Sequence, residues 1–114
     1  MDITTKATKL REAATIMQER GLARWDAEAP NRSVCIGGAL SLALTGRANC
    51  WNSDVNDLLN DVSRTLCRLG RMKSDSTDYP YAKAVNWNNT VARDADEVAQ
   101  MLKLTAEDIE LGAV

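Results

Sequence analysis

This 114-residue sequence contains no histidine, which limits the catalytic and metal-binding chemistry that the chain can perform. Neither a Ser-His-Asp nor a Cys-His nucleophile can form, and a mixed Cys/His zinc site is excluded. The three cysteines, Cys35, Cys50 and Cys67, include no Cys-x-x-Cys pair, and their odd number argues against a secreted disulfide framework. We interpret them as reduced thiols that act as small buried hydrophobic residues. We predict no cofactor and no metal site.

An enzyme built on this chain would have to use Cys, Lys, Asp or Glu. Cys67 is the best candidate nucleophile, because it stands beside Arg68 and near Arg64. It also lies next to an apolar stripe, which favours burial. Acidic pairs such as Asp57 and Asp61 have helical spacing but no visible third group to complete a site. A histidine-free enzyme is therefore only a distant alternative.

One helix face is basic. Arg64, Arg68 and Arg71 lie at positions i, i+4 and i+7, and Lys73 follows just beyond. This basic stripe could bind phosphates or an acidic partner, or it could complement the helix dipole and pair with Asp57, Asp61 or Asp75. The net charge of −2 and the isoelectric point near 5.1 argue against broad phosphate binding. A nucleic-acid-binding regulator is the second hypothesis.

A Trp-Asn element allows two interpretations. In the structural one, Trp87 anchors the core while Asn88 and Asn89 bond to nearby backbone. In the binding one, these three residues and Arg93 form a recognition patch, since Trp and Arg are frequent at interface hot spots. Trp25 lies in a polar loop, where it either packs back onto the core, which we favour, or marks a contact surface.

The elements that must position these residues are helical. Apolar residues recur every three or four positions before Gly21 and again between Val55 and Leu69. The run from Val34 to Leu44 is rich in Ala and Leu and poor in β-branched residues, which favours a helix over a strand. Segment 81–85 could be either. The expected helices are 5–20, 34–44, 53–69 and one from about 94 onward, separated by loops at 22–33 and 73–80.

These elements predict an all-α fold, a compact bundle of four or five helices in one domain (residues 1–114), with room for one short strand pair. Thr4 or Thr5 is expected to cap the first helix and Asp94 the last, which could break at Leu104. Gly37, Gly38 and their neighbours are small enough to let another helix approach closely, including one from a second copy of the chain.

The sequence resembles a small domain family of unknown function from actinobacteria and their phages. One block of resemblance runs from Leu10 to Leu40 and contains Glu19-Arg20-Gly21, an aromatic residue in the loop, Cys35 and Gly38-Ala39-Leu40. The other runs from Val85 to Leu102 and contains Val85-Asn86-Trp87-Asn88-Asn89 and Arg93-Asp94-x-x-Glu97-Val98. Asn89 stands where the family usually has Asp, and Asp94 where it has Thr. The resemblance implies no particular activity.

The leading functional hypothesis is a small protein-binding domain, which would fit a phage accessory protein acting on a host component. Its partner would be another protein or a second copy. Residues 90–114 carry two basic and six acidic side chains, which disfavours nucleic acid. The sequence shows neither a signal peptide nor a membrane-spanning run, so we expect a cytoplasmic protein.

Overall fold

The chain folds into five α-helices. The computed structural model describes residues 1–72 and 80–113. Its helices are α1 (Ile3–Arg20), α2 (Ile36–Thr45), α3 (Ser53–Arg68), α4 (Pro80–Thr90) and α5 (Ala95–Leu111). The predicted all-α fold is confirmed. Within the described ranges, β-pairing is confined to two isolated bridges, in which Val34 pairs with Leu22 and with Glu28.

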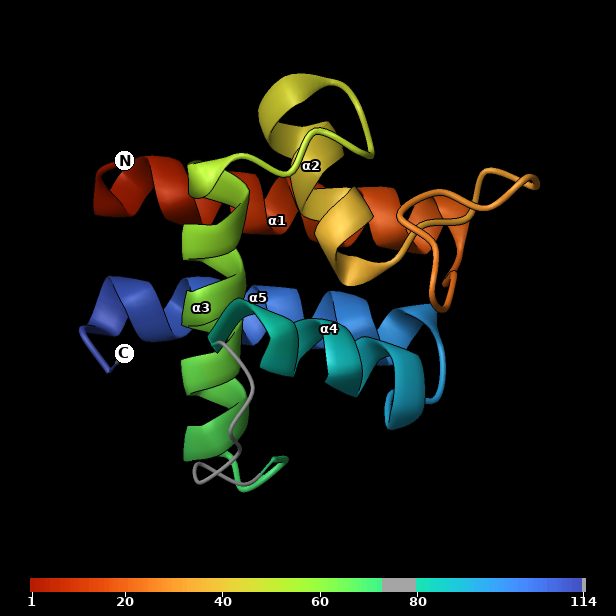
Figure 1. The fold of residues 1–114 in the computed structure, drawn as a ribbon. Helices are drawn as coiled ribbons and strands as arrows, with labels where there is room; N and C mark the ends of the chain where they lie inside the picture. The colour runs from red at the N-terminus through yellow and green to blue at the C-terminus, as the bar shows by residue number, and fades with distance from the viewer. Residues whose placement is uncertain (73–79, 114) are drawn as a thin grey trace.

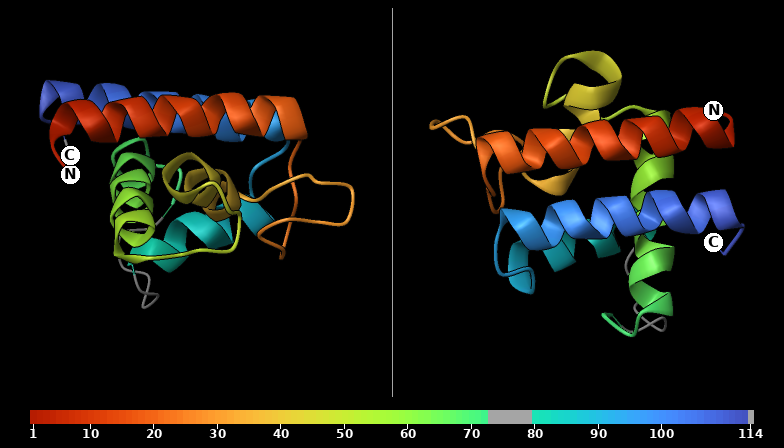
Figure 2. Two further views of the ribbon diagram at one scale, coloured as in Figure 1. Left: turned by 90° about the horizontal axis from the view of Figure 1, so that it is seen from above. Right: turned by 180° about the vertical axis from the view of Figure 1, so that it is seen from behind.

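The helices form two layers. α1 and α5 lie side by side and antiparallel in one layer, while α2, α3 and α4 make up the other (Figures 1 and 2). α3 crosses behind both helices of the first layer (Figure 2, right). The most extensive helix pairing is between α1 and α5. The two ends of the chain therefore meet at one end of the molecule, away from the loop between α1 and α2.

The core fills the space between these layers. The apolar stripe predicted for the first helix is buried except at Ile3, which is exposed, and the stronger stripe on α3 is buried from Val55 to Leu66. The indole of Trp87 is the largest fully buried side chain that the structure describes. It supplies aromatic volume to the core of a chain that contains no Phe. The fully buried large side chains include Leu10, Met17, Ile36, Leu40, Leu58, Leu59, Leu66 and Met101.

Helix ends follow short-range chemistry, with two corrections to the predictions. Asp94 caps α5 as predicted, because its Oδ1 accepts the N–H of Glu97 at 2.9 Å. The cap of α1 is Asp2 rather than Thr4 or Thr5, since the Asp2 carboxylate accepts the N–H of Thr5. The predicted break at Leu104 is wrong, and α5 continues to Leu111.

The structure settles one open alternative and corrects another expectation. Segment 81–85 belongs to the longer helix α4, although its sequence carries only a weak apolar pattern. Gly37 and Gly38 face no second helix, because a Cβ on Gly37 would collide with the ring of Trp51 and one on Gly38 with the carbonyl oxygen of Ala27. The predicted loop 73–80 lies outside the described residues except for Pro80, where α4 begins.

Candidate binding surface around Trp25

The two ends of the loop between α1 and α2, residues 21–35, are joined by backbone hydrogen bonds. Ala23 donates its N–H to the carbonyl of Val34 at 2.8 Å, and Val34 donates back to the carbonyl of Gly21 at 3.0 Å. Further out, Ala29 donates to the carbonyl of Ser33 at 2.9 Å. These bonds satisfy the backbone of a segment that is neither helix nor strand. They leave two short stretches, around Trp25 and around Arg32, to project from the loop.

Asn88 of α4 connects this loop to the rest of the fold. Its side chain is fully buried. Its Oδ1 accepts the N–H of Ile36 at 2.9 Å, and its Nδ2 donates to the carbonyl of Ala23 at 3.1 Å and to Oδ1 of Asn89 at 3.0 Å. Since Ile36 is the first residue of α2, Asn88 satisfies an N–H that has no partner within that helix. One amide thus joins α4, α2 and the loop.

Asn89 and Arg24 fix the position of the loop backbone at Trp25. The Oδ1 of Asn89 accepts the backbone N–H of Trp25 at 2.9 Å. The guanidinium of Arg24 donates to the carbonyl of Asn88 at 2.8 Å and to that of Ala92 at 2.5 Å, at the C-terminal end of α4. These carbonyls lack helical partners, so a cation is favourable there. Sequence reasoning missed Arg24, for which adjacency to Trp25 was the only available signal.

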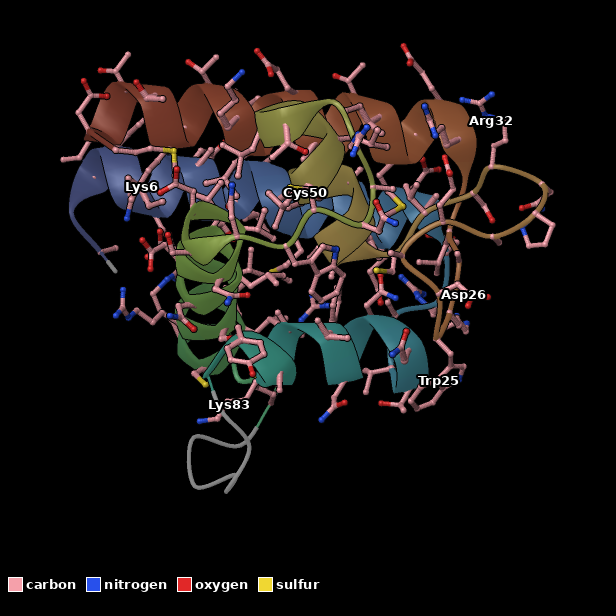
Figure 3. All side chains as sticks on the ribbon, turned by 45° about the horizontal axis from the view of Figure 1, so that its top comes forward. Lys6, Trp25, Asp26, Arg32, Cys50 and Lys83 are labelled. Atoms are coloured by element: carbon pink, nitrogen blue, oxygen red, sulfur yellow. The ribbon has the colours of Figure 1, made fainter. Side chains whose placement is uncertain are left out.

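Trp25 itself points into solvent. Its side chain is 71% exposed and its φ angle is 70°, so the packing that we favoured from the sequence is wrong. Figure 3 shows the ring at the outer edge of the molecule, beyond the end of α4, with Asp26 beside it. A positive φ is unusual for a bulky side chain. Among the described residues other than glycine, only Trp25 and Arg32 adopt it.

A small cavity of about 110 Å³ adjoins Trp25. Its wall includes Cys35, Trp51, Val85 and Asn89, so it lies between the loop, the segment that leads into α3, and α4. Burial raises the pKa of the Cys35 thiol, and its Sγ accepts the N–H of Gly38 at 3.3 Å. Cys35 is therefore a neutral helix cap that contributes apolar surface to the cavity, rather than a nucleophilic thiolate.

The other members of the predicted patch are placed differently. Trp87 is 1% exposed, and its Nε1 has no hydrogen-bond partner among the residues that the structure describes. Trp87, Asn88 and Asn89 are all buried and build the scaffold, and of these three only Asn89 lines the cavity beside Trp25. Arg93 is exposed and pairs with Glu97 at 2.9 Å, one turn into α5. Of the five predicted residues, Trp25 and Arg93 are accessible to a partner.

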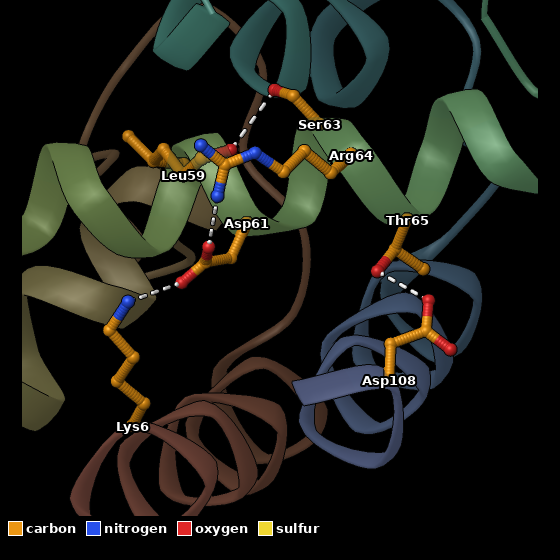
Figure 4. A network of polar contacts seen from close by, with 7 residues as sticks. All are labelled: Lys6, Leu59, Asp61, Ser63, Arg64, Thr65 and Asp108. Atoms are coloured by element: carbon orange, nitrogen blue, oxygen red, sulfur yellow. Dashed lines mark hydrogen bonds and ion pairs between the residues drawn. The ribbon is translucent and has the colours of Figure 1, made fainter. Parts of the chain in front are cut away.

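The predicted basic stripe is largely neutralised within the chain. Asp61 is buried and accepts Nζ of Lys6 and a guanidinium nitrogen of Arg64, both at 3.0 Å (Figure 4). Asp108 of α5 is also buried and receives Arg68 through two nitrogens, at 2.7 and 2.8 Å. The sequence pattern anticipated Asp61 as a partner but not Asp108. Arg71 is exposed, and Lys73 lies outside the described residues.

Cys67, the candidate nucleophile, lines a different surface groove from the cavity beside Trp25. Cys67 is half-buried in a groove of about 320 Å³ between α3 and α4, together with Asn60, Ser63 and Lys83. Within residues 1–72 and 80–113, no three Cys, Asp or Glu side chains come close enough to share a metal ion. None of the described helices is long and apolar enough to cross a membrane.

Comparison with known families gives one match. The model of a family of unknown function, DUF6197, matches residues 1–108. The chain belongs to this family. The match thus covers α1 to α4 and α5 as far as Asp108, including the Asn88 network and the loop that presents Trp25. No curated protein and no solved structure matches the chain.

Proposed function

We propose that the chain is a protein-binding domain that presents Trp25 to its partner. One observation carries the proposal: a tryptophan is held in solvent in a backbone conformation that bulky residues avoid. Strain of this kind costs about 1–3 kcal/mol and persists only where the surroundings impose it. Here the bonds from Asn89 and Arg24 impose it. Trp is also among the residues most enriched at interface hot spots.

Rigid presentation has an energetic advantage. A free loop loses conformational entropy when a partner immobilises it, and that loss reduces affinity. The backbone of Trp25 is already fixed through Asn89, and Asn88 connects α4 to α2 and to the loop. Binding therefore requires little further ordering of this chain. The indole also keeps most of its surface free, so that a partner can remove it from water.

The surroundings of Trp25 indicate the chemistry of the partner. The adjoining cavity of about 110 Å³ has the volume of a few water molecules, at about 30 Å³ each, which is enough for one aliphatic side chain. Asp26 stands exposed at its rim and forms no ion pair with any residue that the structure describes. We infer a partner with an aliphatic residue next to a Lys or Arg, which would reach the cavity and Asp26 together.

The setting belongs to the same proposal. The resemblance to proteins of actinobacteria and their phages supports a phage accessory protein that engages a component of the host cytoplasm. Nucleic acid is disfavoured as the partner, because buried carboxylates already bind Arg64 and Arg68. Self-association through the small residues of α2 is also disfavoured, because Gly37 and Gly38 are covered by Trp51 and Ala27 of the same chain.

The proposal is tested by selecting displayed random peptides on the wild-type protein. We expect the selected peptides to share an aliphatic residue beside Lys or Arg. We expect Trp25→Ser to weaken their binding by roughly thirtyfold, the effect of a hot spot worth about 2 kcal/mol. The matched control is Leu111→Ser, because Leu111 is 81% exposed at the opposite end of the molecule. This control should bind within twofold of wild type.

Two results would overturn the proposal. One is a set of selected peptides that bind Trp25→Ser as tightly as wild type, with unfolding curves showing both proteins equally folded. The other is a concentration-dependent dimer in sedimentation that Trp25→Ser dissociates, which would make a second copy the occupant of this surface.

A further inference from the structure

A second feature of the same loop lies on the other side of the molecule. An open depression of about 390 Å³ is bounded by the C-terminal ends of α1 and α2 and by the outer part of the loop. Three arginines line it, one from each segment: Arg20, Arg32 and Arg47. Figure 3 shows Arg32 at the far corner of the loop from Trp25, beside the C-terminal end of α1.

The charges in this depression are not balanced. Arg20 pairs with Glu28 at 2.6 Å. The side chains of Arg32 and Arg47 form no hydrogen bond or ion pair with any residue in the described ranges. Glu28 is the only acidic residue in the lining, which therefore carries a net charge of +2. This excess stands out in a chain whose total charge is −2.

The backbone at each arginine is fixed. Arg20 is the last residue of α1. Arg32 has a φ of 71° and donates its N–H to the carbonyl of Ala29 at 2.8 Å, which closes a tight turn. Arg47 follows the left-handed glycine that ends α2, and its carbonyl accepts the hydroxyls of Ser41 and Thr45. The three guanidinium groups thus start from defined positions around one space.

We propose that this depression binds a dianionic phosphate group, either as a phosphate ester or as free phosphate. Guanidinium groups match phosphate oxygens through paired hydrogen bonds, and they hold their charge at any physiological pH. A phosphate dianion balances the net +2 of the lining, whereas a single carboxylate leaves half of it unbalanced. Leu42 and Ala48 add a small apolar floor, and Asn49 adds an amide, against which the organic part of an ester can rest.

The binding experiment titrates inorganic phosphate and glycerol phosphate into the protein and follows the arginine Nε–H signals by NMR. The titrations run near pH 8, where a phosphate monoester, with its second pKa of about 6, and inorganic phosphate are both mostly dianionic. Acetate at the same ionic strength serves as the monoanionic control. We expect the Arg32 and Arg47 signals to shift and saturate with both phosphate compounds and to change little with acetate. Tighter binding of glycerol phosphate identifies an ester as the ligand, and equal binding identifies free phosphate.

Variants separate a built site from general electrostatic attraction. Arg47→Gln is expected to weaken phosphate binding at least tenfold. Arg71→Gln removes the same charge from another exposed arginine, one that forms no ion pair with a described residue and lies on a surface that includes Asp94 and Asp96. This variant should change binding by less than twofold. Glu28→Gln releases Arg20 and should tighten binding several-fold. Because this last effect is a gain, partial unfolding cannot imitate it.

Three results would overturn this proposal. They are the absence of saturable shifts with either phosphate compound, equal shifts with acetate, and equal weakening by Arg47→Gln and Arg71→Gln. The peptide-binding proposal is independent, because the surface around Trp25 shares no lining residue with this depression.

Discussion

Replacing Asn88 with Ala tests whether one buried amide holds the Trp25 loop in place. The substitution removes three hydrogen bonds, at 2.9, 3.0 and 3.1 Å. It leaves the N–H of Ile36 and the carbonyl of Ala23 buried without partners, whereas Oδ1 of Asn89 keeps its bond from Trp25. Each orphaned group costs about 1–3 kcal/mol.

The net effect follows from these terms. The two buried groups left without partners lower the free energy of unfolding by about 4 kcal/mol, and the better helix propensity of Ala raises it by about 0.5 kcal/mol. We therefore expect Asn88→Ala to lower the free energy of unfolding by about 3 kcal/mol. For a domain of this size that corresponds to a fall in Tm of roughly 12 °C. Such a loss is a large part of the roughly 5–15 kcal/mol that stabilises most domains.

Urea unfolding followed by circular dichroism measures this change. Asn49→Ala is the matched control, because Asn49 is exposed and its side chain makes no hydrogen bond with a described residue. It should change stability by less than about 0.5 kcal/mol. Hydrogen exchange adds a local readout, since the amide of Ile36 should lose protection in Asn88→Ala. A loss below about 1 kcal/mol with the Ile36 amide still protected would refute the role that we assign to Asn88.

The remaining predictions concern the surroundings of the same loop. Gly38→Ala should destabilise the fold by about 1–3 kcal/mol in thermal unfolding, because the new methyl group meets the backbone carbonyl of Ala27, which cannot rotate away; an unchanged Tm would contradict the close packing. Asn89→Asp should stay within about 1 kcal/mol of wild type, since a carboxylate can accept the same two hydrogen bonds, whereas Asn89→Ala should lose about 2 kcal/mol; equal losses would show that these bonds do not matter. In thiol labelling of the folded protein near pH 8, exposed Cys50 should react first and Cys35 last, because burial raises the pKa of the Cys35 thiol and hides it from the reagent; fast labelling of Cys35 would contradict both effects.

The parts of the fold that sequence predicted are those set by local chemistry. The apolar spacing of α3, the cap at Asp94 and the glycine that ends α2 each depend on residues a few positions apart. Helix α4 was not predicted in full, because its second half reads Asn-Trp-Asn-Asn, and such residues favour turns and caps. Burial of Trp87 and the bonds of Asn88 stabilise the helix there, and both depend on distant segments.

The candidate binding surfaces also depend on contacts between distant segments, which the sequence does not reveal. The sequence drew attention to Trp25, Asn88 and Asn89, and the structure joins them in one network. The sequence could not show which of them is exposed, since that depends on how the loop packs against a helix 64 positions further along the chain. The pairing of Arg68 with Asp108 spans 40 residues and converts a predicted binding stripe into a structural contact.

The antiparallel pairing of α1 with α5 also affects how the protein is made. Arg11 and Glu110 form an ion pair across 99 residues, so the first helix synthesised finds its main partner in the last. At about 5–20 residues per second, the apolar side of α1 waits roughly 5–20 seconds on the ribosome before α5 emerges. Contacts so distant in sequence also slow the final folding step. The nascent chain therefore has an interval in which a chaperone can bind the stripe that α5 later covers.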